Sequence, residues 1–336
     1  MRSCAEGLTP ALMRRGRRGT MTGWAGVTWE SWRDHGDIRA RLDAGADPDA
    51  WGGGRPLHQA ARFGSPEVVA ELAGRVSDVD ALECGTTALW EAVTQDQPDN
   101  ARALVAAGAD PWRPHFGSWS PGRLALAGPV PDLFPVPDEE PGLTAAEQAT
   151  IQRGRQLVEA LGRFHYEGTG VACIAGIDAA EAIRRLDATP VDEEFMADFL
   201  DDPYEYDMDE SLLIAGVTTV PGGCIVTQPW GYTPSAPGAM TRLTTGTVGY
   251  GLYANPKSGN QGSIVRNGTV EGWDLHPGGG PCPGDTPEEV LASYLYRHHA
   301  VAYACAFAGL RPSSARAVTG PADTWIRLPD LDYWEH

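Results

Sequence analysis

The chain has 336 residues, of which 45 are acidic and 26 basic, giving a formal net charge of −19, and 42% of its residues are hydrophobic. This length is sufficient for two domains with sizeable cores. The acidity excludes nucleic acid and anionic membranes as natural partners, because both would repel the chain, and it favours cationic partners. No apolar run approaches the roughly 18 residues of a membrane span, so we expect no membrane segment.

Residues 1–20 are rich in arginine, and the arginines follow a weak apolar stretch, which is the reverse of the order in a secretory signal. A second methionine, Met21, comes directly after them. We interpret residues 1–20 as a basic extension that is disordered or lies upstream of the true start. The six cysteines are scattered without a C-x-x-C pair, so we expect a reduced, cytoplasmic protein.

The first third of the chain repeats itself at a period near 32 residues. Asp47, Asp78 and Asp110 each close one unit at this spacing. Two full units lie at 52–83 and 85–114. A partial unit precedes them at 32–50, and a degenerate one follows at 117–134. A fixed period of this length is typical of stacked helical repeats. We therefore expect an all-α solenoid over residues 21–127, with about three units and degenerate ends.

Two motifs in these units match a known pattern. A helix start reads Arg-Pro-Leu-His-Gln-Ala-Ala at 55–61, and Gly-Ala-Asp closes two units, at 45–47 and 108–110. Together they resemble the ankyrin repeat, which stacks short helix pairs joined by projecting turns. The resemblance implies that the two alanines allow paired helices to approach closely. It also implies that the glycine of each Gly-Ala-Asp ends a helix in the left-handed region.

Some positions depart from the pattern. Trp90 replaces the motif histidine of the preceding unit, and residues 73–77 lack Gly-Ala-Asp. With only about three units, we expect the array to be supported by the segment that follows it. For His58 itself, we expect a hydrogen bond to neighbouring backbone and no catalytic role.

The turns that project from such an array are the expected interaction site. Stacked repeats expose a concave face and a row of turns, and the repeats carry no catalytic chemistry of their own. Tryptophan and arginine at exposed turns are residue types that dominate binding energy at interfaces. We predict contacts with a protein partner at Asp49, Trp51, Glu83, Trp112, Arg113 and His115. The alternative is that Trp51 and Trp112 cover neighbouring repeats.

Residues 128–143 are rich in proline and acidic residues, which is typical of a linker. Thr144 and Glu147 then form a capping-box pattern, so we expect a helix to about Phe164. Strand patterns follow, and two hairpins are indicated by the turn residues at 221–223 and 267–268.

A second capping box, Thr286 with Glu289, predicts a long C-terminal helix that continues to about Leu310. Mixed strands and helices in this order favour an α+β domain with antiparallel hairpins over residues 144–336.

The order of four stretches in this part also resembles a known sequence type: ACIAGIDAAEAIRRL, GVTTVPGGCIVTQPWGY, YGLYANPKSGNQGS and VRNGTVEGWDL. They are similar to an uncharacterised domain of actinobacterial proteins that is sometimes carried behind ankyrin repeats. The resemblance covers most of Tyr166–Asp330. It implies a fold and supplies no catalytic residue.

Lys257 is the single lysine of the chain and lies in YANPKSGNQGS. In a phosphate-binding loop the lysine follows the glycines between a strand and a helix, and this spacing fails that test. A hairpin tip accounts for the composition. The alternative to a non-catalytic interaction protein is a small-molecule-binding or enzymatic C-terminal domain. Its pocket would be lined by Trp230, Tyr232, Tyr250, Tyr253, Lys257, Asn260 and Trp273.

The run 192–210 contains ten carboxylates and no basic residue. It lacks the central glycine of a calcium loop, so we expect a solvated acidic face or a docking surface for a cationic partner.

Histidines and cysteines show no ligand spacing, and adjacent His298 and His299 are expected on different sides of one helix. Cys173, Cys224 and Cys305 lie in apolar contexts and are expected in the core. We expect neither metal nor cofactor, since no serine elbow, nucleotide-binding fingerprint or HExxH motif is present. The sequence therefore favours a non-catalytic protein-interaction protein.

Overall fold

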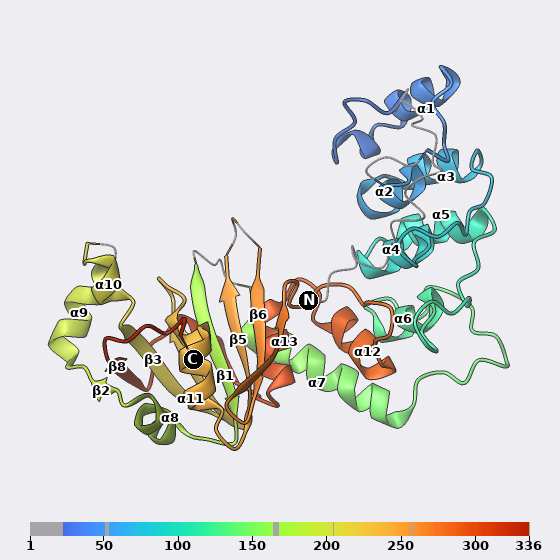
Figure 1. Ribbon diagram of the computed structural model, residues 1–336. Helices are drawn as coiled ribbons and strands as arrows, with labels where there is room; N and C mark the ends of the chain where they lie inside the picture. The colour runs from blue at the N-terminus through green and yellow to red at the C-terminus, as the bar shows by residue number, and fades with distance from the viewer. Residues whose placement is uncertain are drawn as a thin grey trace. The chain divides into compact units, whose positions relative to one another are not determined.

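The computed structural model describes residues 23–50, 54–163, 168–203, 205–255, 257 and 259–335 (Figure 1). They form two compact units, each of which is described by itself. The array unit contains the described residues up to Ala149 together with Pro281–Tyr294, and the sheet unit contains Thr150–Gly280 and the chain from Leu295 on. The extension expected at residues 1–20 and the alternative start at Met21 lie outside the described residues.

The array unit is built from short helices that stack in pairs. They are η2 (Ser31–Arg33), α1 (His35–Asp43), α2 (Pro56–Phe63), α3 (Pro66–Ala73), α4 (Ala88–Thr94), α5 (Pro98–Ala106), α6 (Pro121–Ala127) and α12 (Pro287–Leu295). Helix α2 packs on α4 and α3 packs on α5, so equivalent helices of successive repeats form two layers (Figure 1). This is the all-α stack that the period near 32 predicts.

Local sequence fixes where these helices begin and end. Proline occupies the first turn of α2, α3, α5 and α6, where its missing N–H leaves no bond unmade. Ser65, Thr87 and Ser120 cap α3, α4 and α6, because each side chain accepts a backbone N–H three residues later. Gly45 and Gly108 have φ of +94° and +102°, which confirms the predicted left-handed helix ends.

The core of the stack is apolar and dense. Its buried side chains include Leu57, Ala60, Ala61, Leu72, Leu89 and Leu104. One buried polar group ties the layers together: the Asn100 side-chain amide lies 3.1–3.3 Å from the carbonyl oxygens of Ala60, Ala61 and Gly64. These bonds supply donors to carbonyls at the end of α2, where the Gly64 N–H also donates to the Ala60 carbonyl at 2.7 Å.

The last repeat is incomplete, and a segment distant in sequence completes it. No helix follows α6 before Ala145, although every residue between them is described. The Trp119 indole N–H donates to the carbonyl of Pro287 at 2.8 Å, and Gly128 closely approaches the Tyr294 hydroxyl. The sequence predicts that 281–294 belongs to the C-terminal domain, whereas the structure places it in the array unit, where it supplies this missing cover.

Helix α7 (Ala145–Leu161) begins at the predicted capping box. The Thr144 N–H donates to Glu147 at 2.7 Å, and the Glu147 N–H donates to the Thr144 hydroxyl at 3.2 Å. The preceding residues 128–143 contain neither helix nor strand.

The sheet unit contains one antiparallel sheet of eight strands in the order β2-β8-β3-β4-β1-β5-β6-β7 (Figure 1). The strands are β1 (Thr169–Ala175), β2 (Thr189–Pro190), β3 (Ile214–Val220), β4 (Gly223–Gln228), β5 (Val248–Ala254), β6 (Gln261–Arg266), β7 (Thr269–Asp274) and β8 (Thr324–Arg327). Both predicted hairpins form, β3–β4 and β6–β7. Asn267 and Gly268 have φ of +48° and +73°, as a two-residue turn of this kind requires.

Helices cover both faces of the sheet. They are α8 (Ala179–Leu186), α9 (Glu193–Asp201), α10 (Met208–Ser211), η3 (Thr233–Ser235), α11 (Pro237–Leu243), α13 (Ala300–Phe307) and α14 (Arg316–Thr319). Ile174 joins α8 and α11 in one core, while Tyr250 packs on Tyr303 and Phe307 of the opposite face. Because both faces are covered, β1 is buried over its first six residues. The α+β expectation with antiparallel hairpins is confirmed.

The predicted long C-terminal helix is wrong, because the chain forms α12 and α13 with a break between them. His298 has φ of +64°, which ends α-helical geometry, and the His299 N–H donates to the Tyr296 carbonyl in a turn. His298 and His299, predicted on different sides of one helix, lie in this break. Among the described residues, no helix is long and apolar enough to cross a bilayer.

Candidate interaction surface

The turns between repeats share one local geometry. Asp47, Asp78 and Asp110 each accept a hydrogen bond from the backbone N–H two residues later, at 3.0, 2.9 and 2.9 Å. An aspartate in this position closes the turn with its own side chain. The recurring aspartates therefore shape the turns, which accounts for their spacing in the sequence.

Neighbouring turns are also tied to one another. The Ser77 N–H donates to the carboxylate of Asp49 at 3.0 Å, and the Asp110 N–H donates to that of Asp80 at 3.1 Å. In the same way, the Arg55 N–H donates to the Glu83 carboxylate at 2.9 Å. These bonds join residues about one repeat apart, so they hold the turns in a row.

Two of the predicted partner-binding residues thus have structural roles. Asp49 and Glu83 are both half-buried, and each uses a carboxylate oxygen to accept a backbone N–H of a neighbouring repeat, that of Ser77 for Asp49 and that of Arg55 for Glu83. They position the turns, and they leave less of each carboxylate for a partner.

His115 is likewise engaged within the array. Its Nδ1–H donates to the Arg113 carbonyl at 2.8 Å, and its Nε2 accepts the Thr87 N–H at 3.2 Å. The ring stacks on Trp90 with centroids 5.2 Å apart. Burial lowers the pKa of His115, so the ring is neutral with its proton on Nδ1. This residue links two turns.

The Trp112 side chain covers the neighbouring repeat, as the alternative interpretation holds. A Cβ built on Gly122 would lie 2.9 Å from its ring, and the indole N–H donates to the Pro135 carbonyl at 3.1 Å. Trp51 lies outside the described residues.

Arg113 extends from the turn row into solvent. Its guanidinium makes one long hydrogen bond, 3.4 Å, to the Asp80 carbonyl, which places it over the adjacent turn. On that turn Leu82 is 47% exposed and Cys84 is exposed. We call Leu82, Cys84, Arg113 and Pro114 the turn-tip surface. Leu82 was not predicted, because only the folded chain shows that this leucine is uncovered.

His58 has the structural role that the sequence predicts. Its Nε2–H donates to the Thr86 carbonyl at 3.0 Å, and the residue is 1% exposed. Burial lowers the pKa of His58, although the Thr86 bond and the nearby Glu83 carboxylate oppose that effect. The neutral ring thus joins two repeats through backbone.

Comparison with known proteins agrees with this geometry. Residues 35–115 match the family model of ankyrin repeats, in three copies. This segment is an ankyrin-repeat array. The match spans α1 to α5 and ends at the last complete turn. No curated protein matches the chain.

The residues predicted to line a pocket around Lys257 are spread over both faces of the sheet. Tyr250 is buried beneath α13, and its hydroxyl donates to Asp274 at 2.7 Å. Burial raises the pKa of Tyr250, so it remains protonated. Tyr253 packs against Tyr232, with ring centroids 6.0 Å apart, on the opposite face.

The other members lie further apart. Trp230 stacks on Trp325 at 5.7 Å, and its indole N–H donates to Ser211. Lys257 is exposed at the β5–β6 hairpin, where its N–H donates to the Asn255 side chain at 2.8 Å. This is the hairpin tip that the sequence favours. Asn260 is half-buried and Trp273 is 44% exposed.

The acidic run 192–210 forms α9, α10 and their connections. All ten of its carboxylate residues are exposed, while Met196 and Phe199 pack inward. Asp192 and Asp207 cap the two helices, and Glu210 pairs with Arg327 at 3.1 Å. The run therefore presents an acidic face.

Cys173, Cys224 and Cys305 are buried, as predicted. In the described part of the chain, no three His, Cys, Asp or Glu side chains are placed to hold a metal ion.

Proposed function

We propose that this protein is a non-catalytic, cytoplasmic interaction protein whose ankyrin array binds a protein partner. The observation that carries the proposal is the three-copy array at residues 35–115. Ankyrin repeats generally mediate protein–protein interaction, and they do so through surfaces that the stacked units hold in register. The hydrogen bonds between turns supply that register here.

The turn-tip surface is the part of the array that we propose to contact the partner. Arg113 supplies a cation with five donors, and exposed Leu82 supplies apolar area beside it. Asp49, Glu83 and His115 act on this surface by positioning it. Trp112 stabilises the turn on which Arg113 stands.

The charge of the array indicates what kind of partner it binds. Residues 35–115 contain 13 acidic and 7 basic side chains. Asp47, Asp78 and Asp110 are exposed along the turn row. We therefore propose a partner whose basic surface faces the exposed aspartates. Within that surface, an acidic or carbonyl-rich centre would accept hydrogen bonds from Arg113. The acidic face at 192–210 is a second proposed docking surface for a cationic partner.

Cross-linking capture from native lysate tests the proposal. The baits are the wild type, Arg113→Glu, Leu82→Asp and the control Arg102→Glu. Arg102 is exposed on α5, away from the turns, and pairs with Asp99. We expect one protein to be captured by the wild type and the control, and to be reduced at least tenfold by both turn variants. Capture that is equal for all four baits would contradict the proposed surface.

A further inference from the structure

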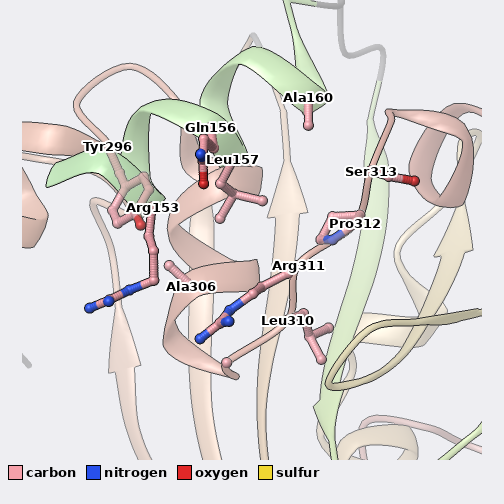
Figure 2. A pocket seen from close by; sticks show the side chains of 11 residues that line it. Arg153, Gln156, Leu157, Ala160, Tyr296, Ala306, Leu310, Arg311, Pro312 and Ser313 are labelled. Carbon is pink, nitrogen blue, oxygen red and sulfur yellow. The ribbon is translucent and has the colours of Figure 1, made fainter. Parts of the chain in front are cut away.

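A cleft of about 370 Å³ opens in the sheet unit between α7 and the chain that follows α13 (Figure 2). Its volume lies in the range of small-molecule sites. None of the cleft-lining residues belongs to the set predicted around Lys257. No sequence motif connects its two walls, which are more than 130 residues apart in the chain.

Two arginines line the cleft, and no aspartate or glutamate does. Arg153 donates to the Thr150 hydroxyl at 2.9 Å, and the Arg311 guanidinium makes no hydrogen bond to the described residues. Within the described ranges, neither arginine forms an ion pair. In Figure 2 both guanidinium groups extend toward the same end of the cleft, while Ser313 lies toward the other.

The cleft is a basic region in a strongly acidic protein. Residues 150–163 and 295–313, which form its walls, contain five arginines and one glutamate, whereas the whole chain has a formal charge of −19. The exposed guanidinium groups of Arg153 and Arg311 thus face a cleft that no carboxylate lines. Guanidinium groups in such a setting can bind an anion from solution.

The backbone that carries Arg311 is fixed on both sides. Gly309 has φ of +72°, and the Leu310 N–H donates to the Cys305 carbonyl at 2.8 Å, which ends α13 in a Schellman motif. The Arg311 N–H donates to the Pro221 carbonyl at 2.8 Å, and Pro312 is buried. Because the backbone of Arg311 is already fixed, only its side chain loses conformational entropy when a ligand binds.

The remaining walls offer one donor and an apolar surface. Gly154 allows α7 to approach Tyr296, whose hydroxyl has no hydrogen-bond partner among the described residues. Burial raises the pKa of Tyr296, so this hydroxyl keeps its proton. Leu157 and Leu310 supply apolar area.

One feature opposes anion binding, because the C-terminus of α13 also faces the cleft. Its macrodipole is equivalent to about half a negative charge, which is smaller than the two full positive charges of the arginines.

We propose that this cleft binds a small phosphate monoester, with the phosphate between Arg153 and Arg311 and the organic group along Leu157 and Leu310. Two guanidinium groups match a dianion, whereas a carboxylate would occupy only one of them. The site is independent of the ankyrin array.

Calorimetric titration of the full chain at low ionic strength tests this site, with phenyl phosphate, inorganic phosphate and benzoate as probes. We expect phenyl phosphate to bind saturably at one site, and the other two probes to bind at least tenfold more weakly. Arg153→Gln and Arg311→Gln should each weaken phenyl phosphate binding at least tenfold. Both side chains are exposed, so circular dichroism should show unchanged folding.

Two further variants keep the result interpretable. Arg184→Gln removes the same charge from exposed α8 and should change affinity less than twofold. Ala160→Trp narrows the end of the cleft away from the arginines and should weaken phenyl phosphate more than inorganic phosphate. Absence of saturable phenyl phosphate binding, or an equal loss in Arg184→Gln, would overturn the proposal. Equally tight binding of benzoate would overturn the assignment of phosphate.

Discussion

Arg123 stands where the repeat motif has its histidine, and it is 5% exposed. Its guanidinium donates to the Gly142 carbonyl at 2.6 Å and to both oxygens of Glu147 at 3.0 and 2.9 Å. It also lies 5.2 Å from the centre of the Trp119 ring. One buried cation thus joins the last repeat, the segment 128–143 and the start of α7.

Replacing this arginine should destabilise the array unit strongly. Arg123→Met takes the guanidinium from the Glu147 carboxylate, which keeps only its Thr144 donors, and breaking a largely buried ion pair costs about 3 kcal/mol. Urea unfolding should show a loss of that size. Arg102→Met, at an exposed pair, should change the free energy of unfolding by less than about 0.5 kcal/mol. Similar losses for the two variants would show that Arg123 is not the anchor.

His58 and His115 make the stability of the array depend on pH. Burial lowers the pKa of both rings, so below the ordinary value of 6.5 the unfolded chain binds protons that the folded chain does not. The free energy of unfolding should be independent of the protonation of these two histidines above pH 6.5. Below that pH it should fall by at most about 1.4 kcal/mol per pH unit for each histidine.

Urea midpoints measured between pH 7.5 and 5.5 test this linkage. His115→Gln, which cannot be protonated, should show a shallower fall than the wild type. Identical slopes would mean that His115 is not held neutral in the fold.

At the scale of elements, the break between α12 and α13 is the clearest departure from expectation. His298 is exposed and left-handed, so a β-branched residue there should be strained and glycine should not be. We predict that His298→Val unfolds more easily than His298→Gly, by about 1–2 kcal/mol. Gln152 is exposed inside α7, and there Gln152→Gly should unfold more easily than Gln152→Val, because glycine is the poorer helix former. The same order at both positions would favour one continuous helix.

Local signals in the sequence predicted local structure well. The capping boxes at Thr144 and Thr286, the turn at Asn267-Gly268 and the helix-ending glycines all depend on residues a few positions apart. Each forms as expected, because the hydrogen bonds that define it lie within one turn of chain.

What the sequence could not predict depends on distant neighbours. The helix break at His298 is not marked by a proline or glycine at that position. It separates α12, which packs on Trp119, from α13, which packs on Tyr250. Trp112 is of a residue type common at interfaces, but its side chain packs within the array. The Arg153–Arg311 cleft brings together residues that no motif connects.

At the scale of the whole molecule, charge should control association. The array and the 192–210 face are both acidic, within a chain whose formal charge is −19. Once a partner has been captured, its association rate should fall as sodium chloride rises from about 50 to about 300 mM, because screening weakens attraction to a basic surface. A rate that is unchanged or increased would contradict a cationic partner.

Hydrogen exchange of the captured complex tests the central claim most directly. If the turn tips contact the partner, amides in 78–86 and 110–117 should exchange more slowly in the complex than in the free chain. Amides of α3, α5 and the sheet unit should be unchanged. Protection confined to the sheet unit, with the turns exchanging as before, would contradict the account of the ankyrin array as the binding surface.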